Sequence, residues 1–169
     1  MWKRVLLAID ESESARTAVD FVTGLAKGTA TGVWVFHIRE IARHTKVLPM
    51  ETPVESQFLV DEAVFSLRLA GIVADGSACS YPATLVARRI ADEAANRSCD
   101  AIVIGSRRLR GFDRISGRGV RERLLRLSDL PLIVAPAPIL SGIHGPARSS
   151  SDRSGGQQAP TPGSRKHPR

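Results

Sequence analysis

The densest group of residues that could bind an anion lies between Gly105 and Val120, in the sequence GSRRLRGFDRISGRGV. A glycine directly follows a short apolar run, a loop rich in glycine and arginine comes next, and a predicted helix begins at the end of the segment. Backbone N–H groups at a helix N-terminus or in a glycine-rich loop bind phosphate, and guanidinium groups add paired donors. The segment therefore predicts a site for phosphate or another anion. It matches neither the P-loop pattern nor a GxGxxG fingerprint.

The arginines of this segment allow two interpretations. Five of them could surround a ligand or could form a solvated loop, namely Arg107, Arg108, Arg110, Arg114 and Arg118. Three more have the spacing of the outer face of a short helix, Arg121, Arg123 and Arg126, with Val120, Leu124 and Leu127 pointing inward. We keep both interpretations for the loop arginines and assign the helix arginines to solvent.

Two further polar side chains follow predicted buried strands. Asp10 comes after the run RVLLAI, where its carboxylate could accept hydrogen bonds from a base or a ribose, or could stabilise the start of the next helix. His37 lies near the end of VWVFHI and could be a polar neighbour of the same site, although a packed residue at a strand end is the more common role. Ser12 and Ser14 are typical of helix caps rather than nucleophiles.

The sequence contains no group of residues with the types and spacing of a catalytic or metal site. The four histidines, His37, His44, His144 and His167, lack the spacing of metal ligands. Cys79 and Cys99 make neither a CxxC pair nor a disulfide framework, which favours a reduced, cytoplasmic compartment. The pair Asp92-Glu93 is interpreted as solvated charge on a helix. We predict no catalytic residues and no metal.

Charge is distributed unevenly along the chain, whose net charge is +7. Residues 1–104 carry a net −2, residues 105–126 carry eight arginines against two acids for a net +6, and residues 141–169 carry a net +4. This pattern favours a local anion site or basic patch over a surface that coats DNA. No apolar run approaches the roughly 18 residues of a membrane span, and the N-terminus reaches Asp10 too soon for a signal peptide.

The last 29 residues differ in composition from the rest. In residues 141–169, Gly, Pro and Ser supply 15 of the 29, and Ile143 is the one large aliphatic residue. Such a segment buries too little apolar surface to offset its ordering entropy, so we expect a disordered basic tail after a domain over residues 1–140. The tail could tether nucleic acid or an acidic partner; an extension without a partner is the favoured interpretation.

Within residues 1–140, short apolar runs alternate with helical periodicity. The pattern predicts strands over 4–9, 33–38, 72–79, 100–104 and 132–135, and helices from Ser12 or Ser14 to Gly28 and over 54–69, 83–97 and 120–127. Predicted buried residues of the middle helices are Phe58, Ala63, Leu67, Ala70, Leu85, Ile90 and Ala94. Apolar strands joined by helical crossovers predict an α/β fold, a Rossmann-like doubly wound parallel sheet with helices on both faces.

Several segments together resemble the universal stress protein family, over about residues 2–136. They are RVLLAIDESESA, VFHI, DAIVIGSR and RGVRERLLRLSDLPLIVAP. The resemblance implies a five-stranded parallel sheet in the order 3-2-1-4-5 with four helices. It also implies a homodimer, commonly formed through the last strand, here Leu132–Val134.

One branch of that family binds ATP through the pattern G-x2-G-x9-G-[ST]. Gly105 matches the first glycine, whereas Arg108, Arg118 and Gly119 stand at the other three positions, followed by a matching Val120. By resemblance, Asp10 and Ile38 fall where the family holds the adenosine. A side chain at a glycine position keeps the backbone away from phosphate and fills its space. The predicted binding residues are Ala8, Ile9, Asp10, Ile38, Gly105, Arg107, Arg108, Arg118, Gly119 and Val120.

The sequence thus predicts a non-enzymatic stress-response or signalling domain that dimerises, has no membrane segment and lacks family-type ATP binding. The alternative is a member that binds ATP or another nucleotide through its arginine-rich loop, residues 105–119. Nucleic-acid binding is disfavoured because Phe112 is the one aromatic residue in that loop, whereas single-strand platforms stack several bases on aromatic rings.

Overall fold

The structure is a computed structural model that describes residues 2–41, 51–106 and 119–136. All of them belong to one compact unit over residues 1–139. The predicted tail, 141–169, lies outside the described residues. In the described part of the chain, no helix combines the length and the apolar character needed to cross a bilayer.

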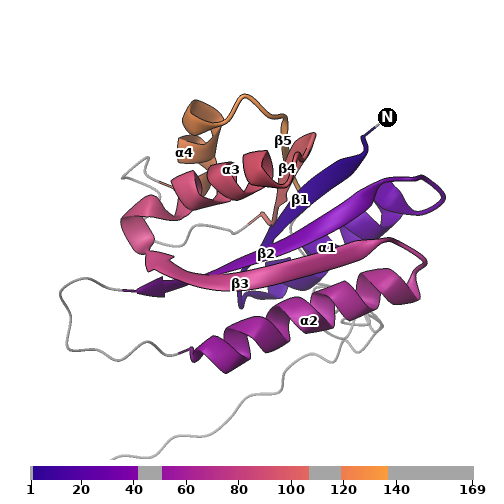
Figure 1. Cartoon of the computed structure of the whole chain (residues 1–169), viewed down its shortest axis with the longest axis horizontal. Helices are drawn as coiled ribbons and strands as arrows, with labels where there is room; N and C mark the ends of the chain where they lie inside the picture. The colour runs from indigo at the N-terminus through magenta and orange to yellow at the C-terminus, as the bar shows by residue number, and fades with distance from the viewer. Residues whose placement is uncertain (1, 42–50, 107–118, 137–169) are drawn as a thin grey trace, which may run out of the picture. The chain divides into compact units, whose positions relative to one another are not determined.

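Five parallel strands form a single sheet in the order β3-β2-β1-β4-β5 (Figure 1). The strands are β1 (Arg4–Ile9), β2 (Gly32–Ile41), β3 (Ala74–Pro82), β4 (Ala101–Ile104) and β5 (Leu132–Val134). The order reverses between β1 and β4, which are direct neighbours. The predicted fold class and strand order are confirmed, and the reversal defines where a doubly wound sheet opens for a ligand.

Helices cover both faces of this sheet (Figure 1). They are α1 (Glu13–Ala26), α2 (Pro53–Leu69), a short 3₁₀ turn η1 (Ala83–Leu85), α3 (Val86–Asn96) and α4 (Val120–Leu127). In β1, Val5 and Leu7 pack in the core under α1 and α2, while Leu6 packs in the core under α3 and α4. Successive strand residues point to opposite faces, so an unbroken apolar strand supplies both cores.

Some predicted boundaries were wrong by several residues. The second strand runs on to Ile41, and the third starts at Ala74 and continues to Pro82. The two strands pair in parallel over nine positions, from Val33 with Ala74 to Ile41 with Pro82. Backbone hydrogen bonds form the strand ladder whatever the side chains are, so a strand can continue through polar residues. A hydrophobicity pattern does not detect such a continuation.

Four predictions about individual side chains were wrong. Phe58, Leu85 and Leu127 are exposed by 68%, 38% and 47%, although each was assigned to the core. Glu93 was assigned to solvent but is 4% exposed, and its carboxylate lies 2.8 Å from Arg89 and 2.9 Å from Arg97. Helical spacing places a residue on a face of its helix, whereas the neighbouring elements decide how far that face is covered.

Candidate functional site

A pocket of about 520 Å³ opens at the carboxyl ends of β1 and β4, the point where the strand order reverses. Strand ends, the first turns of α1 and α4, and the 3₁₀ turn contribute to its wall. Its described lining includes Ala8, Ile9, Asp10, Ser14, Glu40, Thr84, Ile90, Ile104, Gly105, Ser106, Gly119, Val120, Arg121, Glu122 and Arg123. A doubly wound sheet binds its ligands at this place, so the pocket is the candidate site.

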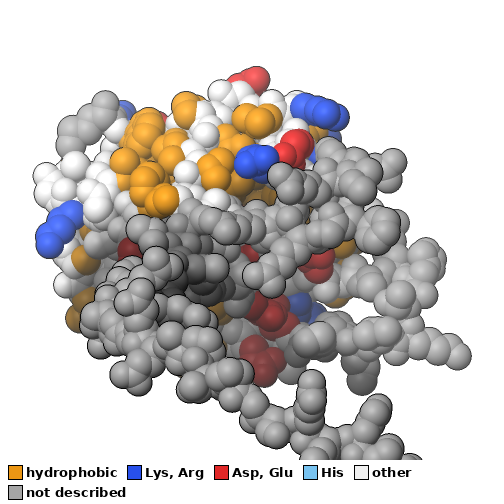
Figure 2. Space-filling model, turned by 180° about the vertical axis from the view of Figure 1, so that it is seen from behind, with side chains coloured by type: hydrophobic (Ala, Val, Ile, Leu, Met, Phe, Trp, Pro, Cys, Tyr) orange, Lys and Arg blue, Asp and Glu red, His pale blue; other side chains and the backbone are white. Residues whose placement is uncertain are grey.

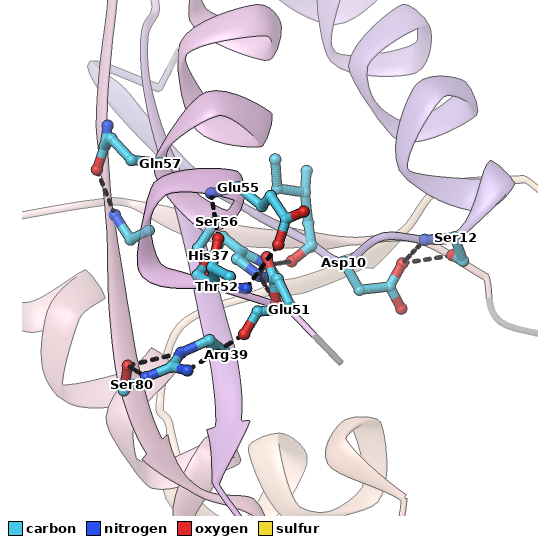
Figure 3. Close-up of polar contacts among 12 residues, drawn as sticks. Asp10, Ser12, His37, Arg39, Glu51, Thr52, Glu55, Ser56, Gln57 and Ser80 are labelled. Atoms are coloured by element: carbon cyan, nitrogen blue, oxygen red, sulfur yellow. Dashed lines mark hydrogen bonds and ion pairs between the residues drawn. The ribbon is translucent and has the colours of Figure 1, made fainter. Parts of the chain in front are cut away.

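Asp10 stabilises the turn between β1 and α1 (Figure 3). Its Oδ1 accepts hydrogen bonds from the backbone N–H of Ser12, at 2.9 Å, and from the Ser12 hydroxyl. Ser12 precedes the first residue of α1, and its hydroxyl is 2.6 Å from that of Ser14. Asp10 therefore stabilises the start of α1, which is one of the two roles predicted for it, and it also lines the pocket.

Gly105 allows β4 to end close against the first turn of α1. A Cβ atom at this position would lie 3.1 Å from the carbonyl oxygen of Ser14 and 3.4 Å from its Cβ. These are tight contacts, and the nearest one is to backbone that cannot rotate away. Close packing against Ser14 therefore gives Gly105 a structural role besides its match to the nucleotide motif.

The start of α4 holds a carboxylate of the chain itself. Gly119 precedes the helix, and a Cβ there would collide with Oε2 of Glu122, so the glutamate side chain turns back toward the helix N-terminus. The pKa of Glu122 is lowered, first by a hydrogen bond from its own backbone N–H and then by the side chain of Arg121. An anion at a helix N-terminus is stabilised by unpaired N–H groups and the helix dipole. Glu122 is that anion here.

The cationic side chains of the pocket already have partners. Arg121 donates from Nε and Nη2 to Oε1 of Glu122, at 3.2 Å and 2.9 Å. Arg123 donates from Nη1 to the carbonyl oxygen of Thr84, at 3.3 Å. Three acids, Asp10, Glu40 and Glu122, stand against these two arginines in the described lining. Among the described lining residues, Glu122 carries the same sign of charge as a phosphate group.

One feature of the pocket favours a ligand. Ser106 follows Gly105 and lines the pocket, and its Oγ is enclosed with no hydrogen-bond partner among the described residues. A buried hydroxyl without a partner is uncommon and costs free energy. The Ser106 hydroxyl could thus bond a polar atom of a ligand, whereas the start of α4 already holds the carboxylate of Glu122.

The predicted binding residues divide into three groups. Six line the pocket: Ala8, Ile9, Asp10, Gly105, Gly119 and Val120. Ile38 is 9% exposed and belongs to the core under α3 and α4, and it is not among the described lining residues. Arg107, Arg108 and Arg118 lie outside the described residues, so the proposed arginine-rich phosphate loop stays a prediction.

A second polar cluster lies on the α1–α2 face of the sheet, near the start of α2 (Figure 3). His37 is 3% exposed, which agrees with its interpretation as a packed strand-end residue. Its Nδ1 is 2.9 Å from the carbonyl oxygen of Ile9, and its Nε2 is 2.9 Å and 3.1 Å from the two carboxylate oxygens of Glu51. Glu51 also contacts the carboxyl group of Glu11.

Two of these roles were missed from the sequence. Glu122 is the third residue after the glycine that precedes α4. A glutamate at that position is a known helix-start signal and could have been found. The partnership of Glu51 with His37 left no local signal, because the two residues are 14 positions apart and come from different elements. Within the described residues, no group of three or more His, Cys, Asp or Glu side chains could hold a metal ion.

Comparisons with known proteins agree with this geometry. The sequence model of the universal stress protein family matches residues 1–136. A search of curated proteins gives no match.

Solved structures with the same fold have low sequence identity to the chain. A universal stress protein family structure from Burkholderia pseudomallei has a TM-score of 0.63 and 22% identity, covering 80% of this chain and 96% of its own. The Archaeoglobus fulgidus universal stress protein in complex with dAMP has a TM-score of 0.58 and 21% identity, covering 79% and 97%. A universal stress protein in complex with cAMP has a TM-score of 0.61 and 17% identity, covering 80% and 97%.

Proposed function

The chain belongs to the universal stress protein family, and from this premise we propose that it is a non-enzymatic, cytoplasmic stress-response domain that does not bind ATP through the family's glycine motif. The observation that carries the proposal is the carboxylate of Glu122 at the start of α4, beside Gly119. A phosphate group at that helix start has to displace this carboxylate and release Arg121 from it. Both steps oppose binding of a polyanion.

A non-enzymatic signalling domain acts through surfaces that bind other molecules. We propose that one such surface is β5 and that the domain dimerises through it. This strand is the edge of the sheet, and its three residues are apolar. From behind, hydrophobic side chains gather in the upper part of the view, on the side that carries β5 and α4 (Figure 2). An apolar strand at the edge of a sheet is suited to pairing with a second copy.

A second candidate function is nucleotide binding with the arginine-rich loop as the phosphate site. The Ser106 hydroxyl, which has no hydrogen-bond partner among the described residues, supports a ligand in the pocket, as do the nucleotide complexes of two structural relatives. In this version the phosphates lie away from α4, and the acids of the pocket face the sugar and base. The two candidates differ in whether ATP binds at all and in which side chains it needs.

Isothermal titration of the nucleotide-stripped full-length chain with Mg-ATP separates them. We expect no saturable heat at millimolar ATP for the natural sequence. We expect measurable binding for Glu122→Gln, because the amide leaves the helix start without a fixed anion. Glu40→Gln is the matched control: it removes another pocket carboxylate away from α4 and should leave ATP binding undetected.

Micromolar binding by the natural chain that is lost in Asp10→Ala would favour the nucleotide-binding alternative. Failure of Glu122→Gln to bind ATP would contradict Glu122 as the blocking group. Phosphate release from Mg-ATP, measured with the same preparations, should stay at the buffer rate. Turnover that disappears in Asp10→Ala would overturn the non-enzymatic part of the proposal.

A further inference from the structure

Helix α2 carries two opposite apolar faces. Val60, Ala63, Val64 and Leu67 are buried against the sheet, as expected for a crossover helix. Four large apolar residues on the same helix are exposed instead: Val54 by 78%, Phe58 by 68%, Phe65 by 62% and Leu69 by 73%. Surface helices ordinarily present polar residues on the side away from the core. The second face therefore requires its own explanation.

These four exposed residues, which we call the α2 stripe, lie on one face of the helix as two pairs, Val54 with Phe58 and Phe65 with Leu69. With about 100° per residue, positions 54, 58, 65 and 69 fall within an arc of roughly 60°, almost opposite the buried face. The stripe spans about 22 Å of helix at 1.5 Å per residue. Four large apolar residues gathered on one exposed helix face indicate an interaction site, whereas apolar residues scattered over a surface do not. Its length matches a helix of about four turns.

The helix is rigidly fixed under the stripe. Thr52 and Glu55 form a reciprocal capping box at its start, with Pro53 in the first turn. Gln57 accepts a hydrogen bond from the N–H of Ala78 in β3, at 3.3 Å, and Arg68 donates to the carbonyl oxygen of Ala74 in β3, at 2.8 Å. The stripe is thus presented by an ordered element, so little ordering entropy is lost when a partner binds.

Negative charge flanks the α2 stripe. Glu55 and Glu62 lie along one side of it and Asp61 along the other, all exposed. Hydrogen bonds from the backbone and side chain of Thr52 keep the pKa of Glu55 below its ordinary value, so this carboxylate stays charged at neutral pH. Among the residues of α2, the one cation beside the stripe is Arg68, which donates to the carbonyl oxygen of Ala74 and lies 4.0 Å from Asp75. A complementary surface must therefore be apolar at its centre and basic at its sides.

A second copy of the chain fits this surface poorly. Antiparallel pairing would match the apolar positions, with Phe58 facing Phe65 and Val54 facing Leu69 of the other copy. The same pairing brings Asp61 and Glu62 of both copies together at the centre of the contact. Four carboxylates at the centre of a helix pair repel one another, so the stripe opposes self-association.

We propose that the α2 stripe binds an amphipathic helix of a partner protein that carries Lys or Arg on both sides of an apolar seam. In this type of recognition, apolar side chains at helical spacing on the partner helix pack against an apolar surface of the domain. Basic flanks on the partner meet Glu55, Asp61 and Glu62, which favours this partner over acidic ones. None of the four stripe residues lines the pocket at the ends of β1 and β4, so occupation of the stripe does not depend on whether that pocket holds a ligand.

A pair of synthetic helical peptides tests the proposal on the full-length chain. Both peptides carry leucines that match the stripe; one has lysine flanks and the other glutamate flanks. By fluorescence anisotropy of labelled peptide we expect saturable binding of the lysine peptide and at least tenfold weaker binding of the glutamate peptide. The double variant Phe58→Ser/Phe65→Ser should weaken lysine-peptide binding at least tenfold, and Asp61→Lys/Glu62→Lys should reverse the peptide preference.

A matched control is Leu125→Ser on α4, where an exposed leucine lies outside the stripe. It should leave peptide binding unchanged, and circular dichroism should show the native helix content in every variant. Equal binding of the two peptides would overturn the charge argument. A loss of dimer mass in Phe58→Ser/Phe65→Ser would identify a second copy as the occupant and overturn the proposal. Tighter peptide binding after deletion of residues 141–169 would assign the stripe to the chain's own tail, with the same consequence.

Discussion

His37 and Glu51 form an enclosed pair, in which Nε2 of the imidazole lies 2.9 Å from Oε1 of the carboxylate (Figure 3). The two side chains are 4% and 11% exposed. The other ring nitrogen, Nδ1, donates to the carbonyl oxygen of Ile9, since a carbonyl only accepts. The imidazole thus faces two acceptors, the carbonyl oxygen of Ile9 and the carboxylate of Glu51. Since Nδ1 donates to Ile9, a hydrogen bond between Nε2 and Glu51 needs a proton either on Nε2 or on the carboxyl group. The pair ties the end of β1 to the chain entering α2.

Glu51→Gln should alter the acid stability of the domain. Burial raises the pKa of Glu51, but hydrogen bonds with His37, Ser56 and Glu11 together hold it below its ordinary value. A carboxyl group with a lowered folded-state pKa stabilises the fold above its unfolded pKa, and this contribution is lost as pH falls through the folded value. Thermal melts should therefore show a stability deficit of Glu51→Gln at pH 6 that shrinks toward pH 3. A deficit of equal size at both pH values would contradict the proposed linkage.

Glu11→Gln should have the opposite sign at neutral pH. Contact with the carboxyl group of Glu51 is the largest of the causes that raise the pKa of Glu11. A raised folded-state pKa in an acid means that the charged form is disfavoured in the fold, so the residue lowers stability above its unfolded pKa. Thermal melts at pH 7 should show Glu11→Gln at or above the natural melting temperature. Asp20→Asn, also exposed, controls for the loss of a surface charge; a melting temperature of Glu11→Gln below that of the control would refute the prediction.

Glu93→Ala should destabilise the domain strongly. The carboxylate is bonded to Arg89 and Arg97, whose guanidinium groups lie over the rings of Phe36 and Trp34. Glu93→Ala removes its hydrogen bonds to two arginines, and because Arg89 and Arg97 are 24% and 43% exposed, water compensates part of their charge. We expect a loss of about 1.5–3 kcal/mol, the range for a hydrogen bond to a charged group. Urea unfolding at pH 7 measures the change. Asp92→Ala, the exposed neighbouring position, should cost less than about 1 kcal/mol; equal losses in the two variants would mean that burial of Glu93 is not the cause.

Two glycine-to-alanine variants should change stability in opposite directions. A Cβ at Gly76 in β3 would lie 2.5 Å from the carbonyl oxygen of Val35 and 2.7 Å from Cγ1 of Val60. We expect Gly76→Ala to cost about 1–3 kcal/mol from overpacking. Gly24 in α1 has nothing within 4 Å of a Cβ, so Gly24→Ala should gain about 0.5–1 kcal/mol from helix propensity. Urea unfolding checks both, and a stabilised Gly76→Ala would contradict the close approach of β3 to β2 and α2.

Ile133→Lys should convert a β5-paired dimer into monomers. The residue lies in the middle of the edge strand, where a charge on each copy disfavours pairing. Size-exclusion chromatography with light scattering measures the mass. Since Ile133 also packs against the core, circular dichroism must show that the variant is folded. A folded variant that remains dimeric would rule out this edge as the interface.

Local sequence pattern was sufficient to predict the fold class. Continuous apolar runs such as Val5–Ile9 fill two cores at once, and this pattern alone requires a parallel sheet with helices on both faces. The order 3-2-1-4-5 was implied by the resemblance to the universal stress protein family, and the structure confirms it, with the reversal and the pocket between β1 and β4. Asp10 and Gly105 could be assigned to that pocket because each directly follows a buried strand.

Tertiary structure alone decided which charges and apolar residues are covered. Glu93 is buried because the aromatic rings of β2 support its two arginines, and Phe58 is exposed because nothing in the described part of the chain packs on that side of α2. Glu51 meets His37 through a contact between separate elements that no periodicity encodes. Local hydrophobic pattern thus predicted the fold class, and the family resemblance supplied the strand order that locates the pocket. The electrostatics of the site depend on distances between groups far apart in the chain, and those distances exist only once the chain has packed.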